Sequence, residues 1–77
     1  MLRLKNVKIG SDYAEADFYP EDSDHNGHIV LSLEDGEIYS CTEVSGYGES
    51  YVAHARQRLV KMANEHDTRS ECLVMWC

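Results

Sequence analysis

The segment Gly46–Glu65 is the only stretch of this 77-residue chain that is long and periodic enough to predict a helix. One side of that helix is apolar and consists of Tyr51, Val52, Ala55, Leu59, Met62 and Ala63, with His66 at its end. The opposite side is polar and consists of His54, Gln57, Lys61, Asn64 and Glu65. Ser50 is the expected N-terminal cap. We therefore expect an amphipathic helix that lies on a sheet.

Short alternating segments predict strands in the rest of the chain. A break in the alternation near Asn6 predicts a bulge in the first strand, and Pro20 ends the second. The pair Asp35-Gly36 favours a tight hairpin between the third and fourth strands. The last strand is apolar on both faces. The predicted strands are residues 2–9, 13–19, 28–33, 38–44 and 70–77.

This order, β-β-β-β-α-β, predicts a two-layer α+β fold that forms one domain over residues 1–77. Four strands form an antiparallel meander, the helix crosses over, and a C-terminal fifth strand returns to the sheet. The fifth strand can pair with the first strand, antiparallel, or with the fourth, parallel. Both arrangements are compatible with the helix length.

One helix covers one face of such a sheet and leaves the other face open. Alternation places on that open face Tyr13, Glu15, Asp17, Tyr19, His28, Val30, Ser32, Tyr39, Cys41 and Glu43. Glu15 and Asp17 are expected to stand there without a neighbouring base. Fixed aromatic side chains among acids favour a binding surface, and the alternative is a half-solvated face with strand-forming tyrosines.

The charge pattern is strongly asymmetric. The net charge is −7, and the ten acidic residues between Asp12 and Glu43 are accompanied by no Lys or Arg. The negative electrostatic field of these acids repels nucleic acid and membranes and attracts basic protein surfaces. The alternative is that the acids only keep the protein soluble. The candidate partner-binding residues are Tyr13, Glu15, Asp17, Tyr19, Glu21, Asp22, Asp24, Glu34, Asp35, Glu37, Tyr39 and Glu43.

The spacing Asp22-x-Asp24-x-Asn26-Gly27 is that of the opening of a calcium loop. The position that normally carries a bidentate Glu is Leu33, and Pro20 is incompatible with an entering helix. We therefore expect a polar hairpin loop and no metal site.

Catalytic chemistry has no clear set of residues in this chain. The chain has an odd number of cysteines, Cys41, Cys72 and Cys77, and no Cys-x-x-Cys pair. This pattern indicates reduced thiols that lie in strands. The Gly46–Tyr51 segment lacks the Gly-Lys-Ser/Thr ending of a phosphate loop, and Glu49 would oppose a phosphate. We expect no enzyme, no cofactor and, since no segment is apolar over a bilayer's width, a cytoplasmic protein.

The segments Phe18–Val30 and Gly46–Leu59 resemble small uncharacterised acidic proteins of phages and mobile elements of Gram-positive bacteria. In size and charge the chain is similar to anti-CRISPR proteins and other nucleic-acid mimics. That resemblance implies a non-enzymatic inhibitor of a nucleic-acid-handling complex, but such families share no motif that assigns residues. The alternative is a homodimer formed through the open face and the fifth strand, with Leu73 and Met75 in the interface.

Overall fold

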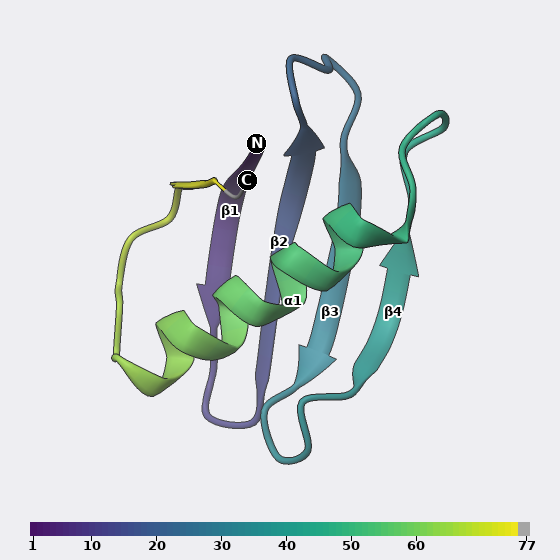
Figure 1. Cartoon of the computed structure of the whole chain (residues 1–77). Helices are drawn as coiled ribbons and strands as arrows, with labels where there is room; N and C mark the ends of the chain where they lie inside the picture. The colour runs from purple at the N-terminus through teal and green to yellow at the C-terminus, as the bar shows by residue number, and fades with distance from the viewer. Residues whose placement is uncertain (76–77) are drawn as a thin grey trace.

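The computed structural model, which describes residues 1–75, has the predicted α+β architecture of a five-stranded antiparallel sheet and one helix (Figure 1). Trp76 and Cys77, which the sequence assigns to the fifth strand, lie outside the described residues. The elements, in chain order, are β1 (Leu2–Ile9), β2 (Tyr13–Pro20), β3 (Gly27–Ser32), β4 (Ile38–Thr42), α1 (Glu49–Asn64) and β5 (Cys72–Val74).

The strand order is β4-β3-β2-β1-β5, so β4 and β5 form the two edges of the sheet. Of the two pairings open for the fifth strand, the antiparallel one with β1 is correct, with Leu2 opposite Val74 and Leu4 opposite Cys72. Over the described residues β5 is shorter than predicted.

Two bulges interrupt the strands. The predicted one lies in β1, where the register with β2 shifts between Lys5 and Lys8 and Asn6 adopts a φ of 55°. The second, which the sequence did not predict, lies in β4. There Val30 pairs with Ser40, whereas Leu31 pairs with Ile38, so Tyr39 is an extra residue.

The β4 bulge changes the face on which the following residues lie. Cys41 pairs with the core residue Ile29, and both Cys41 and Glu43 line a hollow beneath α1. The predicted placement of Cys41 and Glu43 on the open face is therefore wrong.

The core lies between the sheet and α1. The helix contributes Val52, Ala55, Leu59 and Met62, and the sheet contributes Leu2, Leu4, Ala14, Ala16, Phe18, Ile29, Leu31 and Val74. Val44, which follows β4, is buried with them. Each of these strand residues occupies alternate positions along its strand, as a half-buried sheet requires.

The ends of α1 differ from those predicted. Its N-cap is Gly48, which provides no side-chain cap, and Ser50 lies within the first turn. The helix ends at Asn64, and His66 lies beyond it with a φ of 54°. Since His66 is exposed, the prediction that it closes the core stripe is wrong.

Figure 1 shows α1 crossing the sheet diagonally, from β3 at its beginning to beyond β1 at its end. The helix packs on β1, β2, β3 and β5, and all five residues of β4 are exposed. One edge of the sheet is thus left largely uncovered. No helix within residues 1–75 is long and apolar enough to span a bilayer.

Candidate protein-interaction surface

The centre of the open face is a bridge between acidic residues of β2 and a histidine of β3. Nδ1 of His28 lies 2.7 Å from Oδ1 of Asp17, and its Nε2 lies 3.5 Å from Oε2 of Glu15. The side-chain amide of Asn6, at the β1 bulge, donates to the other oxygen of Asp17. One imidazole therefore serves two carboxylates that are two residues apart on β2.

The electrostatics of this bridge follow from its hydrogen bonds. The bond to Asp17 raises the pKa of His28 above its ordinary value of 6.5, against an opposing effect of partial burial. Burial raises the pKa of Asp17, but the hydrogen bonds from Asn6 and His28 outweigh it and hold that pKa below 3.8. The arrangement favours an imidazolium held by carboxylates.

We expect the stabilisation from His28 to weaken as the pH rises above about 6.5, because its pKa is higher in the folded state than in the unfolded state. The stabilisation is complete at pH values below the pKa of His28 in the unfolded state. It is lost as the pH rises through the pKa of His28 in the folded state. The unfolding temperature of the wild type should therefore exceed that of His28→Gln at pH 6 by more than at about pH 8. A constant difference across that range would contradict the bridge. The effect should be small, because the side chain is 42% exposed.

Basic residues of β1 lie beside these acids. Lys5 pairs with Asp17 in the β1–β2 register, and Nζ of Lys8 lies 4.0 Å from Glu15. Arg3 and Lys5 each lie 5.3 Å from the ring centroid of Tyr19, within cation–π range. The expectation that Glu15 and Asp17 have no neighbouring base is therefore wrong, and the open face carries both charges.

The remaining acids gather at the two ends of the sheet. Asp12, Glu34, Asp35 and Glu37 lie in the turns at one end, which a hydrogen bond from Leu33 N–H to the Asp12 carbonyl joins. At the other end, Glu21 accepts hydrogen bonds from the Met1 amino group and from the Tyr51 hydroxyl. Asp22 and Asp24 are exposed in the same loop. The predicted acidic set is thus divided.

The loop with the calcium-like spacing is held by its own side chains. Asn26 donates to the Gly27 carbonyl, and the Ser23 hydroxyl bonds with the backbone of His25. In the part of the chain that the structure describes, no three His, Cys, Asp or Glu side chains could hold a metal ion together.

A hollow of about 750 Å³ separates β4 from the first half of α1. Its apolar wall consists of Ile38, Cys41, Val52 and Ala53. Burial and the nearby Glu43 carboxylate raise the pKa of the Cys41 thiol, so this cysteine is a poor nucleophile. The apolar wall is therefore suited to apolar contact rather than to covalent chemistry, and Thr42, Glu43, Glu49 and Arg56 make the rest of the lining polar.

Five carboxylates lie beside the ends of β4 or in the lining of this hollow. Glu34, Asp35 and Glu37 precede the strand, Glu43 follows it, and Glu49 joins Glu43 in the lining of the hollow. Within residues 1–75, none of the five forms a salt bridge, in contrast with Glu15, Asp17, Glu21 and Asp67. We refer to Glu34, Asp35, Glu37, Glu43 and Glu49 as the acidic rim.

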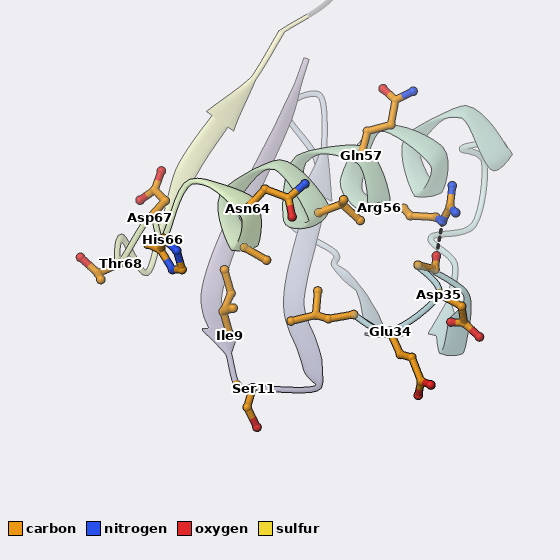
Figure 2. Close-up of a pocket in the computed structure, with 15 residues that line it drawn as sticks. Ile9, Ser11, Glu34, Asp35, Arg56, Gln57, Asn64, His66, Asp67 and Thr68 are labelled. Atoms are coloured by element: carbon orange, nitrogen blue, oxygen red, sulfur yellow. Dashed lines mark hydrogen bonds between the residues drawn. The ribbon is translucent and has the colours of Figure 1, made fainter.

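A second hollow, of about 850 Å³, lies between the second half of α1 and the turns that follow β1 and β3 (Figure 2). Its floor is apolar and includes Ile9, Leu33 and Val60. Nε of Arg56 donates to the Gly36 carbonyl and ties the β3–β4 turn to α1. The carboxylates of Glu34 and Asp35 point away from α1 in Figure 2. They are therefore directed toward the surroundings rather than into the hollow.

The apolar patch required for a homodimer is divided between two faces. Leu73 pairs with Arg3 and is 49% exposed on the open side of the sheet. Met75, 70% exposed, lies beside Val74, Arg58 and Lys61 of the helix side. Tyr13 and the 85% exposed Tyr39 meet around a shallow hollow with Val30 at the β4 end of the open face.

Comparison with protein-family models, curated proteins and solved structures finds no match to this chain. The uncovered β4 edge is the feature that sequence reasoning missed. The sequence pattern that could have indicated this edge is the uncharged segment Ile38–Thr42, which has acidic residues before and after it.

Proposed function

We propose that this chain is a non-enzymatic, cytoplasmic binding protein that engages a basic protein surface through its acidic rim. The role that suits this surface is inhibition of a nucleic-acid-handling complex by occupation of its basic channel. The observation that supports the proposal is the gathering of unpaired carboxylates around an uncovered sheet edge. Paired acids, such as Glu15 and Asp17, have less charge to offer a partner.

The length of the rim is compatible with mimicry of a nucleic-acid strand. Glu37 and Glu43 flank β4, and because Tyr39 is an extra residue in the ladder, the segment between them matches five residues of β3, or about 16 Å. About five nucleotides of a B-DNA strand cover that length at roughly 3.4 Å per step. The carboxylates thus offer a basic channel negative charges over a comparable distance.

The homodimer alternative has less support. Leu73 and Met75 lie on different sides of β5, and the open face between them and Tyr13 carries Arg3, Lys5 and the His28 bridge. A symmetric apolar interface across that face would bury those charges at considerable cost.

The proposal predicts release of DNA from a basic channel. Labelled duplex DNA bound to purified guide-RNA-loaded nucleases should be displaced by the protein from at least one member of the panel, as measured by fluorescence anisotropy. Association should slow by about tenfold or more in the Glu37→Lys, Glu43→Lys double variant, because steering depends on local charge. Added salt should slow the wild type in the same way.

The matched control is the Glu65→Lys, Glu71→Lys variant, which makes the same change in net charge at exposed residues away from β4. It should retain displacement within about twofold of the wild type. The inhibitor role would be contradicted if the protein displaced DNA from none of the nucleases in the panel. Equal losses in both variants would show that net charge, rather than the acidic rim, is responsible.

A further inference from the structure

The edge strand β4 leaves one row of backbone groups without a partner strand. It lies at the end of the sheet, and its side chains Ile38, Tyr39, Ser40, Cys41 and Thr42 include no charge and no proline. Natural edges usually carry Lys, Pro or an inward-pointing charge, because such groups prevent the addition of another strand. None of the five residues of β4 is such a group, although the strand carries a bulge at Tyr39 and Glu43, just beyond it, lines the hollow beneath α1. The edge is therefore open to strand addition.

The flanking hollow provides space for the side chains of an added strand. Alternate side chains of such a strand point toward the two faces of the sheet. Those on the helix side would enter the hollow beside Ile38, Cys41 and Val52, where apolar residues fit. Those on the other side would lie next to Tyr39, which is 85% exposed.

Charge decides which strand fits. If β4 paired with β4 of a second copy, with Ile38 opposite Thr42, Glu37 of each copy would lie opposite Glu43 of the other. Directly opposed like charges are destabilising, and each copy carries a net charge of −7. A strand with Lys or Arg near its ends would instead meet a carboxylate at each end of β4. The edge therefore favours a basic partner over self-pairing.

We propose that β4 binds an extended basic segment of a partner protein as a sixth strand of the sheet. Backbone hydrogen bonds to β4 hold the segment, apolar side chains enter the hollow beneath α1, and Lys or Arg side chains meet the acidic rim. This inference rests on the proposed function and specifies how the basic partner is held.

The test uses a fluorescein-labelled peptide of about ten residues, the lysine–valine peptide, which has two lysines at each end. Between them valine alternates with threonine, a composition that favours extended structure. Anisotropy should show saturable binding to the wild-type protein, and a peptide with glutamate in place of each lysine should not bind. Methylation of every central backbone nitrogen keeps the side chains and the charge but removes the hydrogen-bond donors. It should weaken binding by about tenfold or more.

Protein variants locate the peptide. Glu37→Lys with Glu43→Lys should weaken its binding by about tenfold, and Glu65→Lys with Glu71→Lys should leave it within about twofold. Equal affinity for the methylated and unmethylated peptides would overturn strand addition, while loss on reversal of Glu37 and Glu43 would still support a charged interface. Absence of binding by the unmethylated peptide would also overturn strand addition. The proposed function would then fail only if DNA displacement failed as well.

Discussion

Gly27→Ala should destabilise the protein by about 3 kcal/mol, which corresponds to a fall in Tm of roughly 15 °C for a domain of this size. Gly27 begins β3 and is buried. A Cβ atom there would overlap the carbonyl oxygen of Thr42 on β4 and the ring of Phe18 on β2. Neither group can move freely, because one is backbone in a neighbouring strand and the other fills the core. Thermal unfolding followed by circular dichroism measures the change.

Gly48→Ser is the matched control for this substitution. No atom lies within 4 Å of a Cβ placed at Gly48, which is the N-cap of α1 and has a φ of −85°. A serine there can accept a hydrogen bond from the first turn and should stabilise the protein by a few tenths of a kcal/mol. If Gly27→Ala were tolerated as well as Gly48→Ser, the result would contradict the close packing of β2, β3 and β4 around Gly27.

Leu59→Ala should cost about 3 kcal/mol, since it removes a fully buried side chain from the face of α1 that packs on the sheet. The substitution leaves a cavity that the surrounding strands can only partly fill. Gln57→Ala, two residues earlier on the exposed side of the same helix, should change the free energy of unfolding by less than about 0.5 kcal/mol. Urea unfolding of both variants gives the comparison. Equal effects would contradict the assigned orientation of α1.

Much of the fold follows from local periodicity. The helix stripe through Val52, Ala55 and Leu59 and the alternation of Ala14, Ala16 and Phe18 each place their residues correctly in the core. These patterns are readable because each element buries one face, which fixes the side-chain period. The first and last residues of each helix and strand are harder to predict from the sequence. The helix stop before His66, for example, depends on a positive φ that no residue type there requires.

The bulge at Tyr39 was beyond such reasoning. Residues 38–44 carry apolar and polar side chains on both alternating faces, so a shift by one residue leaves the pattern equally plausible. Only the pairing of Leu31 with Ile38 and of Ile29 with Cys41 reveals the extra residue. As a result, Cys41 and Glu43 lie in the hollow beneath α1 and not on the open face, where regular alternation would place them.

The distribution of charge also depends on three-dimensional neighbours. The acidic run from Asp12 to Glu43 contains no base along the chain, but β1 lies beside β2 and supplies Lys5 and Lys8. His28 adds a third partner from β3. The acids of the rim, in the turn before β4 and beside its edge, have no salt-bridge partner within residues 1–75, and sequence order alone could not separate them from Glu15 and Asp17.

The most direct test of the acidic edge as the binding surface is amide chemical-shift mapping of the isotope-labelled protein during titration with the lysine–valine peptide. The largest shifts, together with slowed amide exchange, should lie at Ile38–Thr42 and at Glu43, because an added strand protects the outer backbone groups of β4. Amides of β5 should change little. Shifts centred instead on Arg3 and Tyr19 of the open face, with β4 unchanged, would contradict binding at this edge.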